Sequence, residues 1–253
     1  MRTFALEARN IERSFGHVRA LDGADFDVFP GEVVALIGDN GAGKSTLVKA
    51  LSGNLAINSG TILVNGKEVD LPTPTTARAL GIETVYQDLA LAPHLSPVQN
   101  MFLGREIRRR GPLGRLGFLD TAAMQRQSRQ AFDELGAPIP SLTAAVGSMS
   151  GGQRQAIAIA RAVTWAKAIV FLDEPTAALG VRQTGHVLET IRRARDRGTA
   201  VVFISHSMPL VMAVADRIQV LRMGRRVATY AAQQTSMEEL VGAMTGAIGG
   251  AGR

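Results

Sequence analysis

The sequence predicts an α/β fold built on a mostly parallel sheet, and two patterns carry this prediction. Several short apolar runs do not alternate with polar residues, as is typical of parallel strands that are buried on both faces. Helical patterns separate these runs, and strand–helix alternation favours a parallel sheet with connecting helices. The expected strands are 33–37, 62–64, 169–172, 201–204 and 218–221, and the expected helices are 45–51, 153–165 and 181–196.

Two regions depart from this alternation. Residues 89–148 show little strand pattern, contain several prolines and include an amphipathic pattern at 124–135, so we expect a helical insertion. The chain up to residue 28, together with 60–69, predicts a small antiparallel β subdomain. We therefore expect a core of residues 1–87 and 155–245, a helical subdomain of 88–154 and a flexible tail of 246–253.

Composition excludes some classes of protein and leaves others open. The 253 residues include no cysteine, which excludes disulfides, zinc–thiolate sites and a cysteine nucleophile. Neither a signal peptide nor an apolar window of spanning length is visible, so we expect a soluble protein. The net charge of +6 suits nucleic acid, an anionic membrane or phosphorylated ligands, but also a surplus of solvated arginine. The basic run 105–110 similarly fits a membrane-domain loop, lipid headgroups or a solvated loop.

A phosphate-binding loop is the first specific motif. Residues 38–45 match G-x-x-x-x-G-K-[ST], and the strand pattern before them and the helical pattern after them provide the setting that this motif requires. Lys44 would bring its charge to the β- and γ-phosphates, and the Ser45 hydroxyl would ligate Mg²⁺. The alternative is an ordinary glycine turn before a helix. The residues expected to bind ATP here are Gly38, Asp39, Asn40, Gly41, Ala42, Gly43, Lys44, Ser45 and Thr46.

Polar residues also follow two other predicted strands. Asp173 and Glu174 directly follow the apolar run 169–172, and His206 lies two residues after the run 201–204. Ligands of open α/β sheets bind at the carboxyl ends of strands. Asp173 would hold Mg²⁺ through water, Glu174 would polarise a water aimed at the γ-phosphate, and His206 would contact that phosphate. The alternative is two surface acids in a turn and an ordinary surface histidine.

A third segment is the most specific. Met149-Ser150-Gly151-Gly152-Gln153 resembles the signature sequence of the ABC ATPase family, usually written LSGGQ, with Met149 in the leucine position. Ser150 is a good N-cap for the helical pattern that follows, so this is a second helix start suited to an anion. The resemblance implies that Ser150, Gly151, Gly152 and Gln153 close over ATP held by a second subunit in a head-to-tail dimer.

The resemblance covers about residues 4–242 and implies further roles. Gln87 matches the glutamine that contacts Mg²⁺ and the attacking water and senses the membrane partner, so Ser45, Gln87 and Asp173 form the expected metal site. Phe15, 29 residues before Lys44, takes the place of the aromatic residue stacked on adenine. Glu174 matches the catalytic base and His206 the switch histidine. One residue departs from the family pattern, because Gly180 stands where most members have aspartate.

The sequences of the phosphate loop and of segment 177–180 most resemble those of monosaccharide importers of the ribose, xylose and fructose type. This implies an ATP-hydrolysing importer subunit at the cytoplasmic face of the membrane. It would form a homodimer or pair with a second nucleotide-binding subunit, bind transmembrane permease subunits and serve a solute-binding protein. No nucleic acid is expected, although a non-transport ABC ATPase acting on nucleic acid or ribosomes is the alternative; a regulatory subunit without hydrolysis is a third reading. The resemblance also implies that the permease docks near residues 88–93 and 100–105, where apolar side chains mix with few charges. The alternative is that these side chains, Leu89, Leu91, Met101 and Phe102, pack the core of the insertion.

Overall fold

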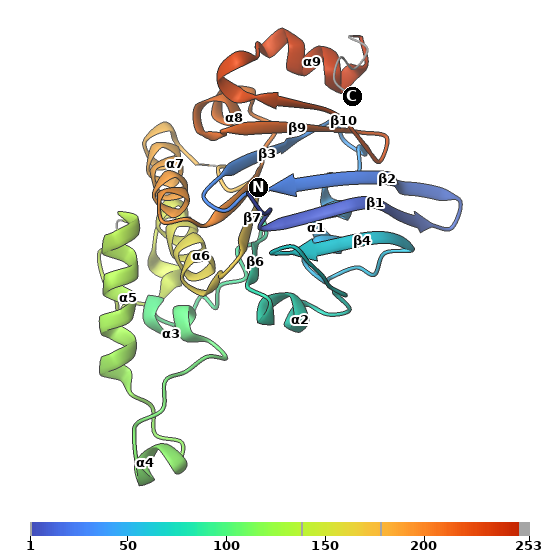
Figure 1. Ribbon diagram of the computed structural model, residues 1–253. Helices are drawn as coiled ribbons and strands as arrows, with labels where there is room; N and C mark the ends of the chain where they lie inside the picture. The colour runs from blue at the N-terminus through green and yellow to red at the C-terminus, as the bar shows by residue number, and fades with distance from the viewer. Residues whose placement is uncertain (1, 138, 178, 248–253) are drawn as a thin grey trace.

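The central sheet has six strands in the computed structural model, which describes residues 2–137, 139–177 and 179–247. The strand order is β10-β9-β3-β8-β7-β6, and every neighbouring pair is parallel except β9 and β10. The predicted mostly parallel α/β sheet is therefore confirmed (Figure 1). The strands are β3 (Val33–Ile37), β6 (Ile82–Val85), β7 (Ile169–Asp173), β8 (Ala200–Ile204), β9 (Arg217–Arg222) and β10 (Arg225–Ala231).

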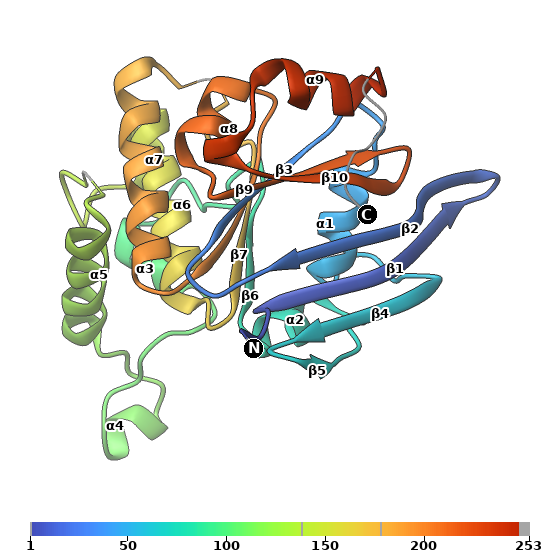
Figure 2. The same cartoon turned by 45° about the horizontal axis from the view of Figure 1, so that its top comes forward.

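A second, antiparallel sheet lies across the first, as Figure 2 shows. Its order is β2-β1-β4-β5, and all of its pairs are antiparallel. It confirms the predicted β subdomain, and the expected strand at 62–64 belongs here rather than to the parallel sheet. Its strands are β1 (Leu6–Phe15), β2 (Val18–Val28), β4 (Ser59–Val64) and β5 (Lys67–Glu68).

The helical insertion is also confirmed and stands beside the central sheet (Figure 1). The predicted boundary between residues 154 and 155 remains a proposal, and the helix α6 runs continuously across it. Of the expected tail, residues 248–253 lie outside the described residues. The insertion contains α3 (Pro97–Phe102), α4 (Pro112–Arg115), α5 (Thr121–Leu135), η1 (Val146–Ser148) and the start of α6 (Gly151–Trp165).

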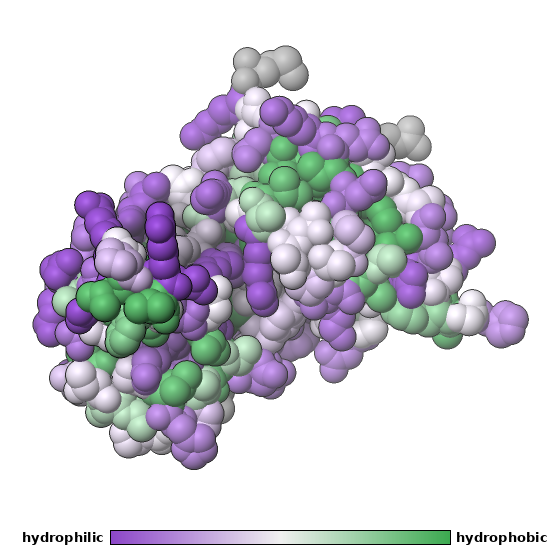
Figure 3. All heavy atoms as spheres, turned by 90° about the horizontal axis from the view of Figure 1, so that it is seen from below, coloured by the Kyte–Doolittle hydropathy of each residue, from purple (hydrophilic) through white to green (hydrophobic). Residues whose placement is uncertain are grey.

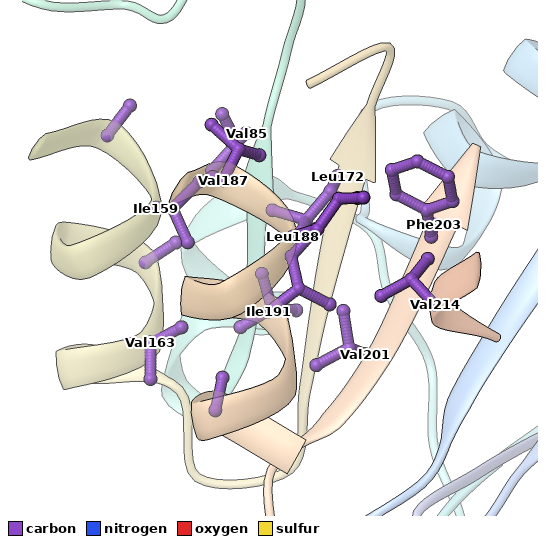
Figure 4. Close-up of a cluster of buried hydrophobic side chains, with 14 of the residues drawn as sticks. Val85, Ile159, Val163, Leu172, Val187, Leu188, Ile191, Val201, Phe203 and Val214 are labelled. Atoms are coloured by element: carbon purple, nitrogen blue, oxygen red, sulfur yellow. The ribbon is translucent and has the colours of Figure 1, made fainter. Parts of the chain in front are cut away.

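Both faces of the central sheet are covered, which explains why its strands are continuously apolar. Leu172 and Phe203 point to one face, where α6 and α7 (Val181–Asp196) pack over them (Figure 4). Phe171 and Val202 point to the other face, against α1 (Lys44–Leu51) and the antiparallel sheet. The remaining helices are α2 (Pro74–Ala79), α8 (Met208–Val214) and α9 (Met237–Thr245), with the short η2 (Ala232–Gln234).

A group of charged residues joins the two sheets. The guanidinium of Arg217 on β9 donates to the Asp27 carboxylate at 2.5 Å and to the Glu32 carboxylate at 2.8 Å. Arg226 on β10 donates to the same Asp27 side chain, and Gln219 donates to the Asp27 carbonyl at 2.6 Å. Asp27 is nearly buried, so these bonds fix the end of β2 against the central sheet.

The helices of the described residues offer no membrane span, because none of them combines sufficient length with sufficient apolar character.

Candidate nucleotide-binding site

A cavity of about 590 Å³ opens at the edge of the central sheet where β3, β7 and β8 end. It brings together the phosphate loop, both strand-end acids, the histidine, Gln87 and Phe15, all of which were predicted from the sequence. Its lining consists of Phe15, Val18, Arg19, Ala20, Asn40, Gly41, Ala42, Gly43, Lys44, Ser45, Thr46, Gln87, Asp173, Glu174, Ile204 and His206. Four of these were missed: Val18, Arg19 and Ala20, because the start of β2 carries no recognisable motif, and Ile204, which was predicted only as a strand residue.

The phosphate loop runs from the end of β3 to the start of α1. A Cβ atom on Gly38 would lie 2.1 Å from the carbonyl oxygen of Leu221, so only glycine fits beside β9 at this point. The Lys44 ammonium donates to the carbonyls of Gly38 at 2.6 Å and of Asp39 at 3.0 Å. Burial lowers the pKa of Lys44, while Glu174, Asp39 and Asp173 oppose that shift. The cation is thus held at the N-terminal end of α1, where an anion is favoured.

Glu174 has an unusual backbone conformation and an unpaired carboxylate oxygen. Its φ of 49° lies in the left-handed region, and its N–H donates to the carbonyl of Ile204 at 3.0 Å, which fixes this turn. The Oε1 atom is buried and accepts no hydrogen bond from the residues that the structure describes; His206 Nε2 is 3.4 Å away without hydrogen-bond geometry. Glu174 lines the cavity, and the acceptor capacity of this oxygen is not used by the described residues. Burial raises the pKa of Glu174, which His206 partly opposes, and burial also raises the pKa of Asp173.

The loop that carries Gln87 is held by the helix α6. Leu89 and Ala90 have positive φ values of 60° and 45°, which turn their carbonyls towards Arg161. The Arg161 guanidinium donates to Leu89 O at 3.0 Å and to Ala90 O at 2.8 Å. Sequence reasoning missed this contact. The available signal was an arginine that interrupts an apolar helix, since a buried guanidinium must find acceptors.

Phe15 lies at the end of β1 with its ring half exposed at the cavity. The guanidinium of Arg13 lies 4.9 Å from the ring centroid. The ring also borders an adjoining hollow that contains Tyr86 and Asn54. An exposed aromatic face beside a phosphate loop is available for stacking on a planar base.

The signature segment lies apart from this cavity. Ser150 caps α6, accepting from the Gln153 N–H at 3.3 Å and donating its own N–H to Gln153 Oε1 at 2.9 Å. A Cβ on Gly152 would lie 2.9 Å from Gln183 of α7, so this glycine is needed for helix packing, whereas the sequence suggested a phosphate contact alone. None of the four signature residues, all within the described ranges, lines the phosphate-loop cavity.

The chemistry of Ser45, Gln87 and Asp173 fits a magnesium ion. They offer a hydroxyl, an amide and a carboxylate oxygen, which are hard donors, and all three line the cavity. No group of three or more carboxylate, histidine or cysteine ligands occurs within the described residues. Phosphate oxygens would therefore complete the coordination, as is usual for Mg²⁺ in nucleotide sites.

Comparisons with known proteins agree with this geometry. The sequence profile of the ABC transporter family matches residues 21–177. A fructose import ATP-binding protein of Rhizobium meliloti is 50% identical, with 96% of this chain and 94% of that protein covered. A xylose/arabinose import ATP-binding protein of Sulfolobus acidocaldarius is 44% identical, with 95% and 93% covered.

Other relatives are longer or more distant. A ribose import ATP-binding protein of Burkholderia ambifaria is 43% identical over 95% of this chain, which spans 46% of that protein. Among solved structures, a nucleotide-free ATP-binding cassette from an ABC transporter has a TM-score of 0.76 at 24% identity, covering 97% of this chain and 96% of that one. A cassette in its ADP conformation has the same TM-score at 25% identity, with 97% and 95% covered.

Replacement of Lys44 by alanine should weaken ATP binding. Lys44→Ala removes a charge-assisted contact to phosphate, so we expect the affinity for ATP to fall about 10- to 100-fold. Isothermal calorimetry measures this directly, and Lys167→Ala removes an exposed lysine as the matched control. Unchanged ATP affinity in Lys44→Ala would contradict the assignment of this loop.

Proposed function

The chain belongs to the ABC transporter family as an ATP-hydrolysing subunit, and from this membership we propose that its ATPase activity drives the import of a monosaccharide. The names of the fructose, xylose/arabinose and ribose relatives support a sugar as the transported solute. The observation that carries the hydrolytic mechanism is the single cavity that contains Lys44, Asp173, Glu174 and His206.

The cavity lining accounts for each part of the nucleotide. Phe15 offers its exposed ring to the adenine, and the amides of the loop and the Lys44 ammonium bind the phosphates. A magnesium ion, when bound, neutralises phosphate charge, and Ser45, Gln87 and Asp173 would hold it. In this arrangement the γ-phosphate would lie beside the strand-end residues.

Glu174 is the proposed general base. Its unpaired Oε1 atom accepts the proton of a water that attacks the γ-phosphate, and its fixed backbone keeps the carboxylate in the cavity. His206, from the neighbouring strand end, contacts the γ-phosphate and stabilises the charge that develops there.

Turnover should depend on the Glu174 carboxylate. Glu174→Gln keeps the shape but removes the base, so we expect hydrolysis to fall about 100-fold or more while ATP binding is retained. Burial raises the pKa of this carboxyl, so wild-type turnover should decline with falling pH earlier than it would with an exposed glutamate. Phosphate release and calorimetry measure the two effects, and near-normal hydrolysis by Glu174→Gln would rule out this role.

A second copy, or a related nucleotide-binding subunit, would complete the site. The Ser150 cap and the N-terminus of α6 form an anion site separate from the phosphate loop, so one bound nucleotide can join two subunits. The exposed Ser150 side chain supports this head-to-tail arrangement.

ATP should therefore produce dimers through the signature. In a Glu174→Gln background, ATP with Mg²⁺ should shift the protein from monomer to dimer in light scattering. Ser150→Arg should abolish that shift, because the long side chain fills the space of the γ-phosphate; Ser148→Arg, on an exposed serine before the signature, is the control. A Ser150→Arg protein that still dimerises with ATP would refute the composite site.

Permease subunits would dock on a groove between α2, α3 and the end of α6, and a solute-binding protein would deliver the sugar to that permease. Of the four apolar side chains named for this surface, Met101 and Phe102 are buried in the core, as the packing alternative expects. Leu89 and Leu91 are partly buried and pack against the same core. The groove of about 240 Å³ includes Ala90, Met101, Leu103 and Arg105 of the expected segments. Its full lining is Arg78, Glu83, Thr84, Tyr86, Ala90, Met101, Leu103, Arg105, Arg161, Ala162 and Trp165.

Sugar uptake should be sensitive to a charge at Leu103, which is 53% exposed at this groove. Leu103→Glu should abolish uptake of labelled sugar in a complemented strain, because an unpaired carboxylate opposes burial in the interface. The purified subunit should keep its basal ATPase activity. Val241→Glu, on an exposed residue of α9, controls for surface charge, and normal uptake by Leu103→Glu would place the docking surface elsewhere.

A further inference from the structure

Residues 107–119 project away from the rest of the molecule, and we call them the projecting loop. Figures 1 and 2 show it as an extension that carries α4 beyond the end of α5. Backbone bonds close its base, because Arg109 N–H donates to Phe118 O at 2.9 Å and Asp120 N–H donates to Ile107 O at 2.7 Å. A Cβ on Gly114 would lie 1.7 Å from Arg109 O, so α4 folds tightly onto the loop's own backbone. The loop is thus a compact, hydrogen-bonded structure rather than an extended connection.

The projecting loop exposes an unusual amount of apolar surface. Of the eleven large apolar side chains that are exposed in the described residues, four belong to this short segment. Leu116 is 75% exposed and Phe118 is 55% exposed, and neither borders the nucleotide cavity, unlike the exposed Phe15. The four side chains are Leu113, Leu116, Phe118 and Leu119.

Its charge is entirely positive. The segment contains Arg108, Arg109, Arg110 and Arg115 and no acidic residue, and all four arginines are exposed. The preceding Arg105 differs, because its guanidinium pairs with Glu83 at 2.6 Å and lies over the Trp165 ring. Arg105 therefore anchors the base of the loop to β6 and α6, and the basic residues beyond it face solvent.

We propose that the projecting loop binds the anionic surface of a lipid bilayer. Its arginines match lipid phosphates in charge and in their capacity for two parallel hydrogen bonds. Its leucines and Phe118 insert at the boundary between headgroups and acyl chains, as apolar side chains of basic interfacial segments do. The loop projects from the molecule, and none of its residues lines the nucleotide cavity or the groove proposed for the permease, so an extended flat surface suits it better than a protein side chain.

The position of the loop agrees with a bound state in which the loop and the groove proposed for the permease both face the membrane. Leu103 lines the groove proposed for the permease, and the projecting loop starts only four residues later. Figure 3 looks at the molecule from below, and an apolar patch bordered by hydrophilic side chains lies at the end where Figure 1 places α4. This orientation rests on the proposed function, whereas binding to lipid by the isolated chain does not.

Vesicle binding by the purified full chain tests the proposal. We expect binding to vesicles of phosphatidylcholine with phosphatidylglycerol to be at least about 100-fold tighter than to phosphatidylcholine alone, and to weaken at high salt. The double variant Arg109→Gln and Arg110→Gln should bind about 30-fold more weakly, since each basic residue near an anionic surface contributes a factor of about five. Leu116→Ser with Phe118→Ser should lose at least about tenfold while its charge is unchanged.

Matched variants separate the loop from overall charge. Arg192→Gln with Arg193→Gln removes two positive charges from α7, and Val181→Ser removes an exposed apolar side chain; both should bind vesicles as the wild type does. Basal ATPase activity should be normal in all these variants, which shows that they fold.

Three outcomes would overturn the proposal. They are equal affinity for neutral and anionic vesicles, equal losses in the loop and α7 variants, and absence of vesicle binding. If the last result accompanied loop-dependent capture of the chain by a detergent-solubilised permease, the loop would be a protein contact instead. In each of these outcomes, normal ATPase activity would leave the proposed function intact. Absence of ATPase activity in the wild-type protein would contradict the proposed function and would not bear on lipid binding.

Discussion

Burial of both faces of the central sheet is the constraint on which the rest of this structure depends. Because α6 and α7 cover one face and the antiparallel sheet with α1 covers the other, β3, β7 and β8 have no exposed face on which to carry polar groups. Polar residues can follow these strands only at their ends. Parallel pairing brings those ends to one edge, where Asp173 of β7 lies in register with Ile204 of β8, just before His206. The chemistry of the cavity is thus a consequence of the packing.

The helix α6 connects three features that the sequence presents separately. Its N-terminus carries the Ser150 cap, its middle packs against α7 and the sheet, and Arg161 near its end holds the loop of Gln87. A displacement of this helix would move the signature and alter the support of Leu89 and Ala90, whose positive φ values require that support. One rigid element therefore links the surface of the proposed dimer to the loop of Gln87, the glutamine proposed to hold the metal.

Patterns that depend on neighbouring residues could be predicted from the sequence. The strands 33–37 and 169–172 and the helix 181–196 follow from continuous apolar runs and a helical period, and β3 and α7 have these same bounds. α6 begins two residues earlier than its apolar pattern, because Ser150 and Gln153 cap it reciprocally. The strand-end motifs also predicted the residues that meet at the cavity, but contacts between distant residues outside these motifs could not be predicted. Nothing local indicates that Arg217 reaches Asp27, 190 residues away, or that Met101 faces the core.

Gly180 stands where most members of the ABC ATPase family have aspartate, and the structure shows what folding requires at this position. It stands at the N-cap of α7, where an aspartate side chain would accept a backbone hydrogen bond, yet its own N–H donates to Gln183 Oε1 at 3.3 Å and α7 forms in full. Glycine at an N-cap costs only a few tenths of a kcal/mol relative to aspartate. The buried Val187 and Ile191 supply far more stability to this helix. The acid usual at this position in the ABC ATPase family is therefore dispensable for the fold, and we propose that its absence acts on the coupling between two subunits.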